Sequence, residues 1–104
     1  MSTYWVEYNP ENRWAVRGEL TRYNITQDCW SLHVSQVLSQ LNKEQPIIIE
    51  LGAVERVDSA GLAWLINLVR DAKKYGFTVI FNDIPQELNN LAKISDASAL
   101  LPVQ

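Results

Sequence analysis

The residues of this sequence whose chemistry first needs an explanation are Asp58 and Ser59, in the segment "VDSAGL" at 57–62. A carboxylate and a hydroxyl are adjacent there, two small residues follow, and an apolar run begins at Leu62. Such a pair could cap a helix, because either side-chain oxygen can accept hydrogen bonds from the unpaired N–H groups of the first turn. It could instead be half of a nucleophilic site, or a surface hydroxyl that another protein recognises or phosphorylates.

The catalytic interpretation finds little support elsewhere in the chain. His33 is the only histidine, and Asp58 is adjacent to Ser59, so it is poorly placed to orient a histidine that in turn contacts the serine. No Gly-x-Ser-x-Gly segment surrounds the serine. Cys29 is the only cysteine, which excludes an internal disulfide and a thiolate zinc site. We therefore expect no metal and no cofactor.

Length and composition predict one α/β domain spanning 1–104. The chain has 104 residues, 47% of them hydrophobic, with a formal net charge of −3. That size supports one core, and the acidic balance disfavours a nucleic-acid surface. The longest apolar runs are too short to cross a bilayer, and the N-terminus lacks the pattern of a secretory signal. We expect a cytoplasmic protein that does not insert into membranes.

The hydrophobic periodicity predicts strands and helices in alternation. Four segments have the alternating or β-branched pattern of strands: 3–8, 13–20, 47–51 and 77–81. Three have the spacing or the boundary residues of helices: 26–41, 59–75 and 85–94. A turn at 9–12 makes the first two strands a hairpin, and 52–57 is predicted to be a loop. Gly18 marks either a bulge or a close approach of another backbone segment. The order predicts a four-stranded mixed sheet, with an antiparallel hairpin edge and about three packed helices.

The helix that begins at Ser59 has two predicted faces and an ambiguous shoulder. At about 100° per residue, one arc is apolar and is expected to face the core: Leu62, Leu65, Ile66, Val69 and Ala72. Trp64, Leu68 and Tyr75 fall between this arc and the solvent side. They either fill the edge of the core or form a partly exposed patch beside Ser59, and aromatic patches of that kind are common in protein interfaces.

The block "VDSAGLAWLINLVRDAKKYG" at 57–76 resembles the STAS domain family. The hallmark of that family is a strand followed by Asp-(Ser/Thr)-x-Gly-Leu at the start of a helix, and "GEL" at 18–20 is similar to its second-strand pattern. Within the family, this block and the ending "NNLAKISDASALLP" at 89–102 are most similar to the small stand-alone MlaB-like subunits of phospholipid ABC transport complexes. The likeness extends over nearly the whole chain.

The resemblance implies binding and no enzymatic activity. Subunits of this kind sit on the ATPase (MlaF-like) of an inner-membrane ABC complex, and through it on the permease, in a system that maintains outer-membrane lipid asymmetry. The docking residues implied are Asp58, Ser59 and Ala60. Helical geometry adds Trp64 and Leu68 to that expected surface.

Another branch of the family suggests an alternative function. In anti-sigma-factor antagonists, the hydroxyl residue after the Asp is phosphorylated by a partner kinase, and Ser59 occupies that place. A phosphate would add about −1.5 to −2 charges next to Asp58 and is expected to release a docked partner. The sequence departs from that branch at Ala60, where a second hydroxyl is usual.

Overall fold

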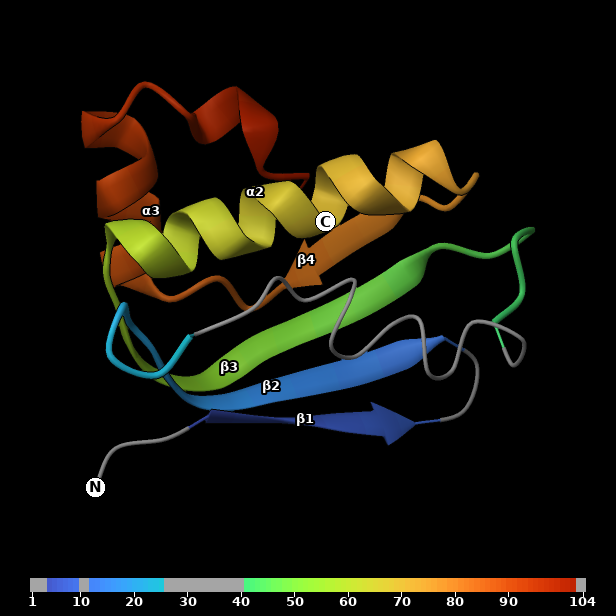
Figure 1. The fold of residues 1–104 in the computed structure, drawn as a ribbon, viewed down its shortest axis with the longest axis horizontal. Helices are drawn as coiled ribbons and strands as arrows, with labels where there is room; N and C mark the ends of the chain where they lie inside the picture. Colours follow the sequence, from blue (N-terminus) through green and yellow to red (C-terminus); the bar gives the residue numbers. More distant parts are fainter. Residues whose placement is uncertain (1–3, 10–11, 26–40, 103–104) are drawn as a thin grey trace.

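The computed structural model, which describes residues 4–9, 12–25 and 41–102, contains one sheet with the strand order β1-β2-β3-β4 (Figure 1). The strands are β1 (Tyr4–Asn9), β2 (Arg13–Leu20), β3 (Ile47–Val57) and β4 (Val79–Asn82). β1 is antiparallel to β2, whereas β3 is parallel to both β2 and β4. The predicted mixed sheet with a hairpin edge is confirmed.

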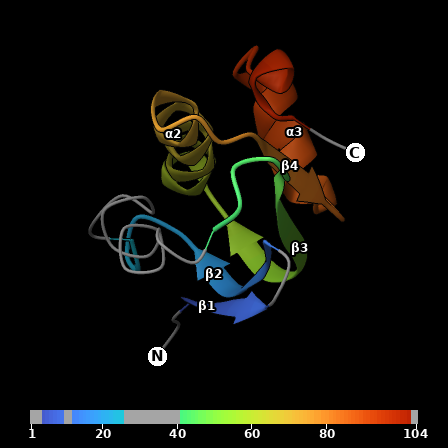
Figure 2. The ribbon, with the colours of Figure 1, turned by 90° about the vertical axis from the view of Figure 1, so that its right-hand side faces the viewer.

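The described residues form two α-helices, which are α2 (Ser59–Lys74) and α3 (Gln86–Ile94), and a short 3-10 helix, η3 (Ser98–Leu100). α2 packs on β2, β3 and β4, and α3 packs on α2 and β3. Figure 2 looks along the strands and shows the curved sheet running from β1 to β4, with α2 and α3 side by side near β4. The predicted helix at 26–41 falls, apart from Leu41, outside the described residues.

Apart from the C-terminal end of β3, the boundaries of the other predicted elements agree with the structure to within two residues. Pro85 precedes α3 as its N-cap, where its fixed φ of −60° and missing N–H cost the helix nothing. Beyond η3 the chain returns to the sheet, since the Phe81 N–H donates to the carbonyl of Pro102 over 2.8 Å and Leu101 is buried. Pro102 therefore pairs with one backbone group on the open edge of β4.

The predicted loop at 52–57 is wrong, because β3 continues as a strand to Val57. The second half of β3 pairs with β2, for example Gly18 with Val54 and Leu20 with Val57. Gly18 has a φ of +93° and lies at a register shift, so its predicted role in a bulge is confirmed. The extended pairing brings the carboxyl ends of β2 and β3 to the same edge of the sheet.

Asn12 joins the hairpin turn to the loop that precedes β3. It is 5% exposed and has a φ of +59°, which asparagine tolerates better than most residues. Its Nδ2 donates to the carbonyls of Asn42 (2.7 Å) and Gln45 (3.2 Å), and its Oδ1 accepts from the Asn42 N–H (3.2 Å). The Ile48 N–H donates to the Asn12 carbonyl over 2.9 Å. One buried side chain thus aligns β2 with β3.

We expect Asn12→Ala to lower the free energy of unfolding by about 2–4 kcal/mol, because it removes three hydrogen bonds and strains the left-handed backbone. Asn12→Gly keeps the backbone conformation and should lose less. Chemical denaturation of the two variants and the wild type measures the difference. Equal stability of all three proteins would show that Asn12 does not hold the two segments together.

Candidate functional site at the start of helix α2

Asp58 caps α2 and ties it to a neighbouring turn. Its backbone is extended (φ −117°, ψ −170°), and its Oδ1 accepts from the N–H groups of Ala60 (3.0 Å) and Gly61 (3.1 Å). Its Oδ2 accepts from the N–H of Arg22, 3.0 Å away in the turn after β2. The predicted cap is confirmed. The carboxylate also links two segments that are far apart in the sequence.

The same contacts set the charge of Asp58. Partial burial by itself would raise the pKa of its carboxyl, but four opposing contributions outweigh it. These are the N–H groups of Arg22, Gly61 and Ala60, joined by the positive charge of the Arg22 side chain. The pKa of Asp58 therefore lies below the ordinary value of 3.8, and the ionised form stabilises the fold.

The sign of this shift predicts how Asp58 contributes to stability at different pH. A lowered pKa gives a contribution that is complete above about pH 3.8 and is lost as the pH falls through the folded-state pKa. We expect Asp58→Asn to cost about 1 kcal/mol near neutral pH, with a gap from wild type that closes in acid. Urea denaturation over a pH series measures the gap. Asp71→Asn, farther along α2, is the control, and a gap that stays constant down to acid pH would contradict the assignment.

Gly61 lies against the end of β2 with no room for a side chain. A Cβ built on Gly61 would overlap the carbonyl oxygen of Leu20 and lie 2.7 Å from Cγ2 of Val57. That carbonyl is fixed, since it accepts from the Asp58 N–H over 3.2 Å. The Asp-Ser-x-Gly motif therefore combines a cap with a close approach, which together set the direction in which α2 leaves the sheet.

Ser59, the first residue of α2, is exposed, whereas Asp58 and Ala60 are half-buried. The Asp58 cap and the contact of Gly61 with the end of β2 therefore fix the first turn of α2, and Ser59 is accessible from solvent. The sequence already disfavoured a Ser-His-Asp catalytic site at Ser59. In the structure, the Asp58 carboxylate that such a site would use accepts hydrogen bonds from three backbone N–H groups, and His33 lies outside the described residues.

The expected exposure of Trp64 and Leu68 is wrong. Their exposed fractions are 3% and 1%, so both belong to the core. The buried stripe of α2 is Gly61, Leu62, Trp64, Leu65, Leu68 and Ala72, while Ile66 and Val69, which we expected in the core arc, are only partly buried. The physical reason is that the sheet extends under the shoulder of the helix. The rings of Trp64 and of Tyr4, on the edge strand β1, pack edge to face with their centroids 5.4 Å apart.

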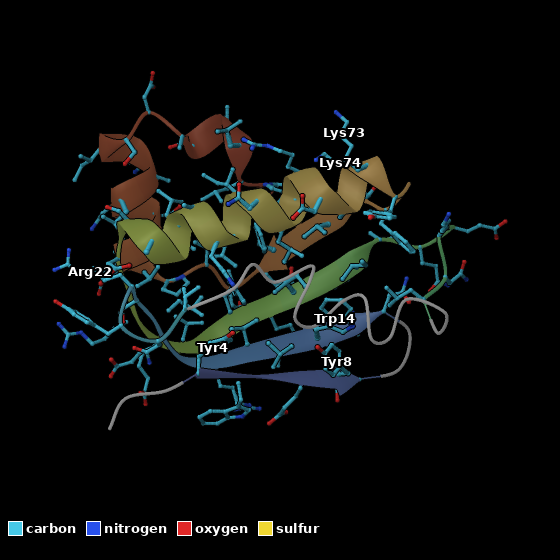
Figure 3. The ribbon with its side chains drawn as sticks, in the orientation of Figure 1. Tyr4, Tyr8, Trp14, Arg22, Lys73 and Lys74 are labelled. Carbon is cyan, nitrogen blue, oxygen red and sulfur yellow. The ribbon has the colours of Figure 1, made fainter. Side chains whose placement is uncertain are left out.

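The structure adds a neighbour that the sequence interpretation missed, the turn at 21–24. Figure 3 shows Arg22 at the end of the molecule where α2 begins, opposite Lys73 and Lys74. Arg22 and Tyr23 line a hollow with Asp58, Ser59 and Ala60. A signal was available in the sequence, because parallel strands end at the same edge of a sheet and the segments after β2 and β3 must meet there.

The residues described include no cluster of three His, Cys, Asp or Glu that could hold a metal ion. Across the same residues, none of the helices is both long enough and apolar enough to span a membrane. The geometry of the site is that of a capped helix end with an exposed hydroxyl and an adjoining turn.

The model of the family described as "Mlab, STAS domain" matches residues 13–102. The matched region begins at β2 and ends beyond η3, so it includes the start of α2 and the turn at 21–24. β1, whose Tyr4 covers Trp64, lies outside it.

Proposed function

Because this chain belongs to the Mlab-type STAS domain family, we propose that it is a non-enzymatic binding subunit of an ABC transporter. Its partner is the ATPase (MlaF-like) of an inner-membrane complex that moves phospholipids and maintains outer-membrane lipid asymmetry. The subunit is cytoplasmic and reaches the permease and the membrane only through that ATPase.

The observation that carries this proposal is the exposure of Ser59 on a helix end whose position is otherwise fixed. The Asp58 cap and the close contact of Gly61 with Leu20 hold the turn before any partner binds. A surface that is already ordered loses little conformational entropy on association, so more of its contact energy appears as affinity.

The docking surface we propose consists of Asp58, Ser59 and Ala60. Trp64 and Leu68, which the sequence placed beside them, lie in the core and act beneath that surface by seating α2 on the sheet. Their replacement should lower stability first and affinity only as a consequence.

Co-purification from the native host in mild detergent tests this function. The expected result is recovery of an ABC ATPase together with its permease, in amounts that fall when Ser59→Asp replaces the wild type. Ser98→Asp, at an exposed serine that opens η3, is the matched control and should recover both proteins normally. Recovery of a sigma-factor regulator without any ATPase would refute the proposal.

The exposed hydroxyl also supports the alternative function, an anti-sigma-factor antagonist controlled by phosphorylation of Ser59. A partner kinase needs an accessible hydroxyl, and Ser59 is exposed. Intact mass of the protein from native cells distinguishes the two functions. A phosphate that maps to Ser59 favours the switch, whereas unmodified protein in complex with an ATPase favours the transporter subunit.

A further inference from the structure

The turn at 21–24, beside the start of α2, is internally ordered. The N–H groups of Asn24 and Ile25 both donate to the Thr21 carbonyl over 3.0 Å, and the Thr21 hydroxyl donates to Asn24 Oδ1 over 2.8 Å. The Arg22 N–H donates to the Asp58 carboxylate. The turn and the start of α2 are therefore joined through one carboxylate, and neither can move far without breaking that bond.

Tyr23 projects from this ordered turn into solvent, with 79% of its surface exposed. The Arg22 guanidinium lies 5.0 Å from the centre of the Tyr23 ring and donates to the Tyr23 hydroxyl over 2.9 Å. These contacts restrict the ring, which offers a partner a large area. Tyrosine and arginine are also the residue types that most often dominate the affinity of protein interfaces.

Two hollows meet at Tyr23 and Asp58. One, of about 330 Å³, is lined by Ser59 and Ala60 from the first turn of α2 together with Arg22. The other, of about 280 Å³, is lined by Glu19, Glu87 and Arg56 among others. Three carboxylates, those of Glu19, Asp58 and Glu87, line the second hollow against one arginine, and Asp58 already accepts from three N–H groups, which leaves Glu19 and Glu87 for a partner's cation.

We propose that Tyr23 is a specificity-determining anchor of the docking surface, and that Glu19 and Glu87 receive an arginine or lysine side chain of the ATPase. This inference rests on the proposed function and extends it to the chemistry of the partner. The ATPase surface must then offer a recess that receives the Tyr23 ring. On one side of this recess it contacts Ser59, and on the other it presents a basic side chain. The two carboxylates and the net charge of −3 both favour a basic partner surface.

The first experiment measures the affinity of the purified chain for the ATPase recovered by co-purification. Tyr23→Ala should weaken binding by about tenfold or more, with a melting temperature within about 2 °C of wild type because the side chain is exposed. Tyr75→Ala is the matched control, since Tyr75 is a 51% exposed tyrosine at the opposite end of α2. Wild-type affinity in Tyr23→Ala would overturn the anchor.

The second experiment tests the charges. In the wild type, Glu87 Oε1 accepts a hydrogen bond from the Val57 N–H over 3.3 Å. Glu87→Gln keeps a side-chain oxygen that can accept this bond, so the fold should be retained. The double variant Glu19→Gln/Glu87→Gln should bind several-fold more weakly and with a smaller dependence on salt, whereas Glu44→Gln, in the loop before β3, should not change either. An unchanged salt dependence in the double variant would exclude the basic contact.

These outcomes separate the inference from the proposed function. If the wild type binds the ATPase, Ser59→Asp does not, and Tyr23→Ala binds as the wild type does, the function stands and the inference fails. If no ATPase is recovered with the wild-type chain, both fail together.

Discussion

Gly61→Ala should destabilise the protein by about 3 kcal/mol, a change of roughly 10–20 °C in melting temperature for a domain of this size. Alanine in place of glycine would normally stabilise a helix by up to about 1 kcal/mol. Here the new Cβ overlaps the Leu20 carbonyl oxygen, which is backbone and cannot rotate aside. Relief requires α2 to lift from the end of β2, and that movement breaks the bond between the Asp58 N–H and Leu20.

Gly52→Ala is the matched control for this substitution. A Cβ at Gly52 would lie 3.4 Å from the Cβ of Asp83, which is an ordinary contact. The free energy of unfolding of Gly52→Ala should therefore stay within about 1 kcal/mol of wild type. Thermal and chemical denaturation of both variants measure the contrast. A Gly61→Ala protein that melts with the wild type would show that the start of α2 is free to shift, and the ordered docking surface would lose its basis.

Ser59→Asp should leave the fold nearly intact and weaken binding to the ATPase by at least about tenfold. The added charge lies in the first turn of α2, where the helix dipole favours it, so the cost of its proximity to Asp58 is largely offset. At an interface the same charge must lose its water and face a partner arranged around a neutral hydroxyl. Affinity should therefore fall while the melting temperature changes little.

Titration of the ATPase with Ser59→Asp, Ser59→Ala and Ser98→Asp separates charge, hydroxyl and position. Ser59→Ala removes one hydroxyl and should reduce affinity less than the charged variant. Ser98→Asp introduces the same charge on the exposed η3 helix and should bind as the wild type does. Equal affinity of all three variants would exclude Ser59 from the interface.

The predictions from sequence succeeded where the deciding forces act between residues close together in the chain. The cap by Asp58, the start of α2 at Ser59 and the bulge at Gly18 follow from local backbone chemistry. The hairpin and the parallel order of the later strands follow from segment lengths and crossover connections. The exposure of Ser59 also agrees with its local position, at the first residue of a helix that leaves the edge of a sheet.

The sequence by itself therefore determined the order of the described elements, the capped helix start and the family motif, because these depend on short-range hydrogen bonding and periodicity. Only the tertiary structure decided which face of α2 lies on the sheet, since Trp64 is buried and its ring contacts that of Tyr4, which comes from a strand far away in the sequence. It also decided the continuation of β3 to Val57 and the hydrogen bond from the Arg22 N–H to the Asp58 carboxylate. Each of these needs a partner from β2 or from the turn that follows it. Periodicity fixes which residues of a helix share a face, but the surface that this face meets is set by strands distant in sequence.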